Sequence, residues 1–205
     1  MNANIDFWGR FRDRNPFSSR ATRPGAIAYR FANGCDLSQL VATLRIHGWW
    51  GQIVGPHGSG KSTLLHALLS PLGDAGRKVR HYTLHSGEKR LPIAGGELKS
   101  WDAETQVIID GFEQLGGWNR SMVKRVCRQQ GAGLLVTSHQ SAGFPTLFSS
   151  AVTPQLAQQL VTDLLPPECQ RIAPDDVARS FERHGGNLRE VFFELYDVYE
   201  TRRSE

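Results

Sequence analysis

Residues 55–63 have the pattern G-x-x-x-x-G-K-[ST], which is typical of loops that bind phosphate groups. Glycines let the backbone curl until its N–H groups point at phosphate oxygens. A lysine brings a positive charge to the outer phosphates, and the hydroxyl that follows it can ligate Mg²⁺. The predicted nucleotide-binding residues are Gly55, Pro56, His57, Gly58, Ser59, Gly60, Lys61, Ser62 and Thr63.

The segments on either side of this loop have the order that the motif requires. Residues 49–54 are short and apolar enough for a buried strand, and the leucines after Thr63 have the spacing of a packed helix face. We expect Pro71 and Gly73 to end that helix. The first turn of the helix would add its positive dipole end to the site.

An acidic residue further along the chain is the next candidate for the site. Asp110 ends the apolar run 105–110, which has the character of a buried parallel strand. A carboxylate there can complete a magnesium shell together with the Ser62 hydroxyl, so both residues are predicted metal ligands. The alternative is an ordinary strand end that enters a turn at Gly111.

Hydrolysis also needs a group that aligns or activates water, and Glu113 is the next acid after Asp110. Glu113 reaches the γ-phosphate only if the chain turns back, which the Asp110-Gly111 pair permits. The alternative is a solvated residue at the start of a helix.

A further polar group follows the apolar run 134–137, which we expect to lie between the loop strand and the acid-bearing strand. Ser138 or His139 could hydrogen-bond the γ-phosphate or the attacking water. The alternative is that hydroxyls simply cap the end of the strand. Of this group, Ser138 is the predicted catalytic residue, together with Lys61 and Glu113.

Arg189 is the last candidate catalytic residue. Gly185 is placed to end one helix, and Asn187 to cap the next with Glu190 as its reciprocal partner. This capping does not require Arg189, and a cation in the first turn opposes the helix dipole. Arg189 therefore needs water or an anion such as a γ-phosphate beside it.

The sequence Gly-Asn-Leu-Arg-Glu at 186–190 resembles the sensor 2 element of AAA+ ATPases. Together with the phosphate loop, the run Val107–Asp110 and the Thr-Ser-His strand end, it makes residues 36–200 resemble a compact AAA+ or STAND-like ATPase. The resemblance implies ATP and Mg²⁺ as cofactors and a catalytic role for Arg189 between lid and nucleotide. The chain departs from the pattern at Gly111, where a glutamate is usual; the arginine-finger candidates, by position only, are Arg120, Arg125 and Arg128.

Alternating apolar runs and helical patterns, followed by helices alone, predict an α/β fold. We expect a P-loop NTPase parallel sheet of about five strands flanked by helices, with a small C-terminal three-helix lid. The expected divisions are a basic N-terminal arm at 1–30, a nucleotide-binding core at 31–153 and the lid at 154–205. Within these, residues 36–46 predict a helix capped by Asp36, and residues 117–130 a second one.

Composition places the 205-residue chain, 40% hydrophobic, among ordinary globular proteins. No apolar run reaches the length of a membrane span and no secretory signal is visible, so we expect a cytoplasmic protein. Cys35, Cys127 and Cys169 are widely spaced, which favours free thiols.

Positive charge is concentrated at the start of the chain. Residues 1–30 hold six arginines and two aspartates, and the remaining residues are neutral overall. Aromatic residues among these arginines (Phe7, Trp8, Phe11 and Phe17) suit nucleic-acid contact, or they pack on the core and leave the arginines in water.

The function that these residues favour is Mg-dependent ATP binding and hydrolysis, coupled to lid movement and regulation of a protein partner. One alternative is a nucleotide-dependent switch with little turnover, and a second is a small-molecule kinase. Assembly into a homo-oligomer is left open by the sequence.

Overall fold

The computed structural model describes residues 15–31, 34–94 and 96–203 and divides into two compact units. One comprises Tyr29–Pro56 and Lys61–Ser150, and we call it the sheet unit. The other, the helical unit, comprises the described residues 15–28, the loop segment His57–Gly60, and residues 151–203.

The sheet unit contains five parallel strands. They are β1 (Trp50–Val54), β2 (Lys78–Thr83), β3 (Thr105–Asp110), β4 (Gly133–Ser138) and β5 (Thr146–Ser149), in the order β2-β3-β4-β1-β5. The predicted α/β class and parallel sheet are confirmed. As expected, β4 lies between β1, which leads into the phosphate loop, and β3, which ends at Asp110.

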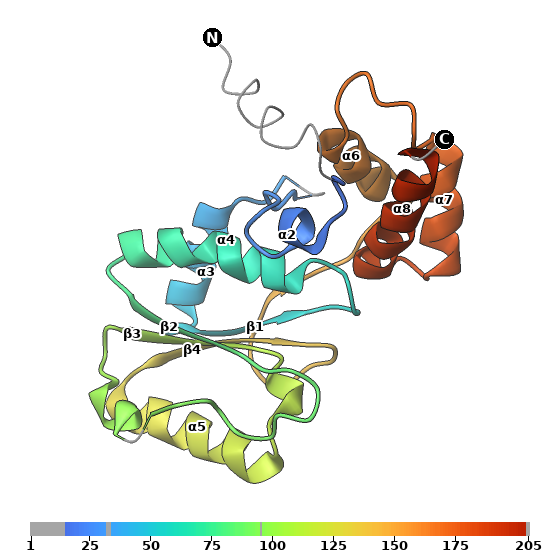
Figure 1. Cartoon of the computed structure of the whole chain (residues 1–205). Helices are drawn as coiled ribbons and strands as arrows, with labels where there is room; N and C mark the ends of the chain where they lie inside the picture. Colours follow the sequence, from blue (N-terminus) through green and yellow to red (C-terminus); the bar gives the residue numbers. More distant parts are fainter. Residues whose placement is uncertain (1–14, 32–33, 95, 204–205) are drawn as a thin grey trace. The chain divides into compact units, whose positions relative to one another are not determined.

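Helices cover both faces of this sheet. Figure 1 shows α5 (Gly117–Gln130) on one face, and α3 (Leu37–Ile46) and α4 (Lys61–Asp74) on the other. Val107 and Ile109 pack in the core on the α5 side, whereas Ile108 packs in the core on the α3 and α4 side. Because successive side chains of a strand point to opposite faces, an uninterrupted apolar run fills both cores.

The start of α3 and the end of α4 can be compared with the helix boundaries predicted from the sequence. The Asp36 side chain accepts a hydrogen bond of 2.8 Å from Gln39 N, so the predicted cap of α3 is confirmed. The sequence predicts that Pro71 and Gly73 end the helix after the phosphate loop; α4 passes Pro71 and ends at Asp74, one residue after Gly73. Pro71 removes one backbone donor from the helix. The helix continues because the next residue, Leu72, is fully buried, and burying a leucine contributes about 2 kcal/mol.

The helical unit contains the three predicted C-terminal helices and a short N-terminal one. They are α6 (Pro154–Leu164), α7 (Pro174–Arg183), α8 (Leu188–Arg203) and α2 (Ser19–Thr22). Phe17 is fully buried in their core, with its ring centroid 6.1 Å from that of Phe192 and 6.3 Å from that of Tyr199. For Phe17, packing on the core is the correct alternative; Phe7, Trp8 and Phe11 lie outside the described residues.

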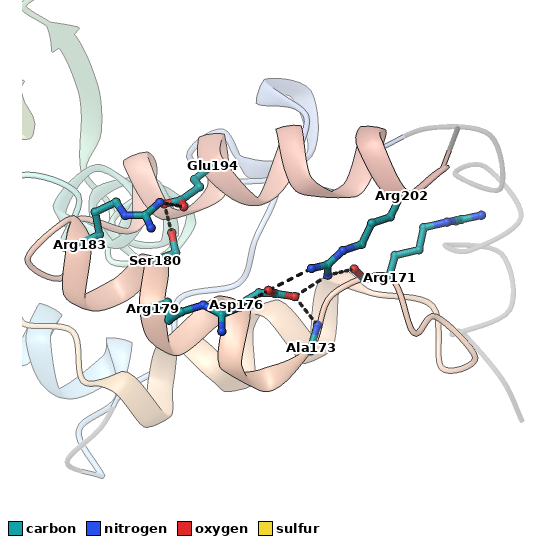
Figure 2. Close-up of polar contacts among 8 residues, drawn as sticks. All are labelled: Arg171, Ala173, Asp176, Arg179, Ser180, Arg183, Glu194 and Arg202. Carbon is teal, nitrogen blue, oxygen red and sulfur yellow. Dashed lines mark hydrogen bonds and ion pairs between the residues drawn. The ribbon is translucent and has the colours of Figure 1, made fainter. Parts of the chain in front are cut away.

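Two carboxylates join α7 to α8, as Figure 2 shows. Asp176 accepts hydrogen bonds from Ala173 N at 2.9 Å, from Arg179 at 2.7 Å and from Arg202 at 2.5 Å. Glu194 accepts a hydrogen bond from Ser180 Oγ at 2.8 Å and pairs with Arg183. These contacts fix both ends of the α7–α8 pair.

The remaining regular elements are two single turns of 3₁₀ helix, η1 (Glu97–Ser100) and η2 (Phe112–Gln114). Within the described ranges, none of the helices has the length and apolar character to cross a bilayer.

Candidate nucleotide site

The phosphate loop connects β1 to α4, and two of its glycines adopt left-handed backbone conformations. Gly58 has φ +67° and Gly60 has φ +88°. Residues with a Cβ rarely adopt these angles, so the curl of the loop depends on glycine. Among the other loop residues, Ser59 is buried, Pro56 and His57 are exposed, and Ser62 and Thr63 lie half-buried in the first turn of α4.

Lys61 folds back over the first residues of the loop. Its ammonium donates hydrogen bonds of 2.7 Å to both the Gly55 and Pro56 carbonyls, and the residue is only 8% exposed. A buried ammonium is stable only where its donors are satisfied, and these carbonyls satisfy two of them. The charge of Lys61 is thereby held at the loop.

His139 connects Lys61 to Glu113. Its Nδ1 lies 3.3 Å from Lys61 Nζ, and its Nε2 lies 2.9 Å from Glu113 Oε1. Nε2 is placed to donate to the carboxylate, while Nδ1 also lies 3.3 Å from the Gly55 carbonyl oxygen. The sequence named His139 as one of two candidates after β4, and it is the one that contacts other predicted site residues.

Glu113 reaches this position because the chain turns back after β3. Gly111 has φ +84°, and a Cβ there would lie 2.8 Å from the Leu84 carbonyl oxygen, so only glycine fits the turn. Arg120 donates to the carbonyls of Glu113 and Leu115, which holds η2 in place. The second carboxylate oxygen of Glu113 is buried and makes no hydrogen bond to any described residue.

Thr137 orients Asp110. Its hydroxyl donates to Asp110 Oδ1 at 2.6 Å and accepts from Gly111 N at 2.9 Å. The sequence assigned no role of its own to Thr137, and the only available signal was its place at the end of β4. Ser138 is buried, and its hydroxyl donates to the Gln140 carbonyl at 2.5 Å, where it closes the turn after β4. A sensor role for Ser138 stays a prediction.

In the helical unit, the loop segment His57–Gly60 contacts the start of α8. A Cβ on Gly58 would lie 1.9 Å from Asn187 Oδ1 and 2.9 Å from Leu188 N. Asn187 Oδ1 accepts from Arg189 N at 3.2 Å, which confirms the predicted cap. The expected reciprocal bond from Glu190 is not formed among the described residues.

Arg189 is exposed, and its guanidinium forms no hydrogen bond or ion pair with another described residue. Of the predicted catalytic residues, Lys61 and Glu113 both contact His139, whereas Ser138 is engaged by Gln140. Arg189 belongs to the helical unit, close in sequence to the Asn187 that contacts Gly58.

The donors of this site fit a magnesium nucleotide. The Ser62 hydroxyl and the Asp110 carboxylate are hard oxygen ligands of the type that Mg²⁺ prefers, and Mg²⁺ usually completes its shell with water and phosphate oxygens. Among the described residues, no three His, Cys, Asp or Glu side chains group to hold a metal ion. The Glu113 oxygen that accepts no hydrogen bond from a described residue offers an acceptor beside His139.

Comparison with known proteins identifies the fold. No family model matches the sequence, and no curated protein matches it. The S. cerevisiae Hsp104:casein complex matches in structure with a TM-score of 0.54 and 13% identity, over 88% of this chain and 39% of that chain. The C. elegans PCH-2 structure gives a TM-score of 0.45 and 13% identity, over 94% of this chain and 74% of that one.

The chain has a P-loop NTPase-like α/β fold. At 13% identity the likeness to Hsp104 bears on the fold alone, and this chain spans well under half of that protein.

Proposed function

We propose that the protein binds ATP with Mg²⁺ and hydrolyses it. The observation that carries this proposal is the contact chain from Lys61 through His139 to Glu113, at the strand ends where Thr137 holds Asp110. A phosphate-binding cation, a metal-ligating carboxylate and a second carboxylate suited to water are grouped at one edge of the sheet.

In this proposal the loop and Lys61 bind the phosphates. Backbone N–H groups of the curled loop and the first turn of α4 supply the donors, and the Lys61 ammonium exchanges its loop carbonyls for phosphate oxygens. Ser62 and Asp110 would hold Mg²⁺, which when bound neutralises charge on the transferring phosphate. Thr137 keeps the Asp110 carboxylate in a fixed orientation for that role.

Glu113 is proposed to align the attacking water. One oxygen of its carboxylate is held by His139, and the other is buried without a partner among the described residues. A buried acceptor without a donor costs free energy of about 1–3 kcal/mol, and a water molecule would recover it. His139 is a positioning residue here, because it acts through Glu113.

We propose further that nucleotide binding affects the helical unit through its own loop segment. Gly58 lies against the start of α8. A phosphate in the curled loop would therefore lie near the first turn of α8, which carries Arg189. Arg189 would then gain the anionic neighbour that its position in the first turn of a helix requires. A change at α6–α8 would expose a surface to a protein partner, which is how ATP binding would be communicated.

A nucleotide switch with little turnover is the second candidate. In this structure the Lys61 ammonium is held by the Gly55 and Pro56 carbonyls, so it must change partners before phosphate transfer. Such a resting arrangement would slow hydrolysis without preventing binding.

One experiment separates the two functions. We would measure ATP binding by calorimetry and phosphate release in parallel for the wild type, Lys61→Ala, Glu113→Gln and Arg189→Ala. For an ATPase, Lys61→Ala should abolish binding, and Glu113→Gln should bind ATP but release phosphate at least about 100-fold more slowly. Arg189→Ala should weaken binding, turnover or both.

The matched control is Glu182→Gln, which makes the same chemical change at an exposed position in α7. It should leave binding and turnover unchanged. Tight binding by the wild type without phosphate release would establish the switch instead, and the absence of any binding heat with Mg²⁺ and ATP would overturn both candidates.

A further inference from the structure

The helix α5 carries four basic residues and no acidic one. They are Arg120, Lys124, Arg125 and Arg128. Residues 31–205 are neutral overall, so this helix is a local concentration of positive charge. Among the described residues, none of the four forms an ion pair with a carboxylate. An uncompensated row of like charges is unfavourable in the free protein and becomes favourable when an anion binds.

Aromatic rings, rather than acids, lie beneath these cations. Lys124 Nζ is 4.3 Å from the centroid of the Phe144 ring, and Arg128 Cζ is 5.3 Å from that of Trp50. Burial lowers the pKa of Lys124, and the neighbouring Arg128 and Arg120 lower it further. The charged groups that act on Lys124 are therefore cations, and the rings give only part of the stabilisation that a counter-ion would give.

A hollow lies at the same place in the sheet unit. It has a volume of about 360 Å³ and is lined by Trp50, Lys124, Arg128, Gly143, Phe144 and Pro145. Lys124 uses one donor on the Ala142 carbonyl, at 3.2 Å. The Arg128 guanidinium makes no hydrogen bond to a described residue, so its donors are available to a ligand.

The outer side of α5 also carries a solvent-exposed aromatic ring. Trp118 is 76% exposed, and Arg125 follows it by seven residues, which places both on one side of the helix. A tryptophan exposed to this extent buries little of its surface against the protein itself. Its flat face is open to stacking by a ligand.

We propose that this surface, formed by Trp118, Lys124, Arg125 and Arg128, binds single-stranded nucleic acid. The cations contact phosphates, while unstacked bases stack on Trp118 and on the guanidinium plane of Arg128. From Trp118 to Arg128 the helix rises about 15 Å, so this surface would hold a short single-stranded segment of a few nucleotides. A duplex would meet the charges alone because its bases are already stacked, and an acidic peptide would make no use of the rings.

The test measures binding of the full chain to a fluorescent oligothymidylate, a DNA duplex and polyglutamate. The charge-reversal variant Arg125→Glu with Arg128→Glu should lose at least about tenfold in oligothymidylate affinity and show a smaller dependence on salt. The matched control, Arg45→Glu with Arg90→Glu, reverses two exposed arginines elsewhere in the sheet unit and should bind as the wild type does. Residues 1–30 are the same in every variant, so their arginines cannot produce the difference.

Trp118→Ala separates stacking from charge. It should weaken oligothymidylate binding about tenfold and leave polyglutamate binding unchanged. Thermal melting checks that each variant is folded. Equal oligothymidylate affinity of the α5 variant and the control would overturn the proposal. Duplex binding as tight as single-strand binding would overturn the single-strand assignment, and a preference for polyglutamate would point to an acidic protein instead.

Discussion

Gly58 of the phosphate loop lies so close to Asn187, the cap of α8, that no other residue type fits between them. A Cβ built on Gly58 would be 1.9 Å from Asn187 Oδ1, and the backbone N of Leu188 would be 2.9 Å away. Gly58 also has φ +67°, which L-residues rarely adopt. The glycine therefore serves two purposes, since it permits the curl of the loop and the close approach of α8.

Replacing Gly58 by alanine should lower the free energy of unfolding and weaken ATP binding. The left-handed backbone alone costs an alanine about 1 kcal/mol or more, and the clash with Asn187 adds to it. Adding Asn187→Ala to this variant should recover part of the loss, because it removes two of the three close atoms. Urea unfolding and calorimetry with ATP would measure both effects.

Gly73→Ala is the control for this prediction. Gly73 lies in α4, and no described atom outside its own stretch of helix comes within 4 Å of the position that a Cβ would occupy. Alanine there should therefore stabilise the helix by about 1 kcal/mol. A Gly58→Ala protein that unfolds and binds ATP as the wild type does would contradict the close contact.

Much of the fold could be predicted because its signals are local. The run 105–110 and the run 134–137 are apolar, short and bounded by turn residues, and both form central strands. The continuation of α4 past Pro71 has a different origin. Local chemistry favours a stop there, but Leu72 is buried by contacts that no local pattern reveals.

The candidate site could be predicted only in part for the same reason. The loop is a contiguous motif, whereas the bonds of His139 to Lys61 and Glu113 join residues from different strand ends. The Gly58–Asn187 contact joins residues that are distant in sequence, and no periodicity encodes it. The aromatic rings beneath the α5 cations also come from separate segments of the chain.

Removing the imidazole of His139 should affect turnover more than binding. In His139→Ala, Lys61 keeps its two loop carbonyls, but Glu113 loses the hydrogen bond that fixes one oxygen. Within the proposed ATPase function, we expect ATP affinity to change by less than about threefold and phosphate release to fall at least about tenfold. Calorimetry and steady-state phosphate release measure the two quantities.

The control for the histidine is His47→Ala, which removes an exposed imidazole at the end of α3. It should leave binding and turnover unchanged. If His139→Ala loses binding and turnover to the same extent, the histidine acts on Lys61 and the phosphates instead of on Glu113.

The three thiols should differ in reactivity. Cys127 is fully buried in the core beside α5, and burial raises its pKa to about 12, so almost no thiolate is present near neutral pH. Cys35 and Cys169 are half-buried free thiols. We expect a thiol-specific disulfide reagent at pH 8 to modify Cys35 and Cys169 in the native protein, and Cys127 only after unfolding in urea.

Mass spectrometry of peptides would assign each modified cysteine. The variant Cys127→Ala serves as the control, since it should keep the native labelling of the other two thiols. Rapid labelling of Cys127 in the native protein would show that the α5 side of the sheet opens more readily than its packing indicates.

Asp176 should make the helical unit sensitive to acid. The hydrogen bond from Arg202 is the main cause that lowers the pKa of Asp176 from 3.8 to about 2, although its burial acts in the opposite direction. A carboxylate with a lowered pKa stabilises the folded state above the pKa of the unfolded chain. That contribution, about 2 kcal/mol here, is lost as the pH falls from about 4 to about 2, because the unfolded chain takes up the proton first.

Asp176→Asn should therefore lower the free energy of unfolding at pH 7 by about 2 kcal/mol or more, since it also leaves Arg202 without its carboxylate. The same substitution should reduce the loss of stability between pH 4 and pH 2. Asp175→Asn removes an exposed carboxylate from the same turn of α7 and should change the stability little at pH 7. Urea unfolding followed by circular dichroism at several pH values measures both effects. An equal acid dependence in the wild type and Asp176→Asn would show that the network in Figure 2 does not set the acid stability of this unit.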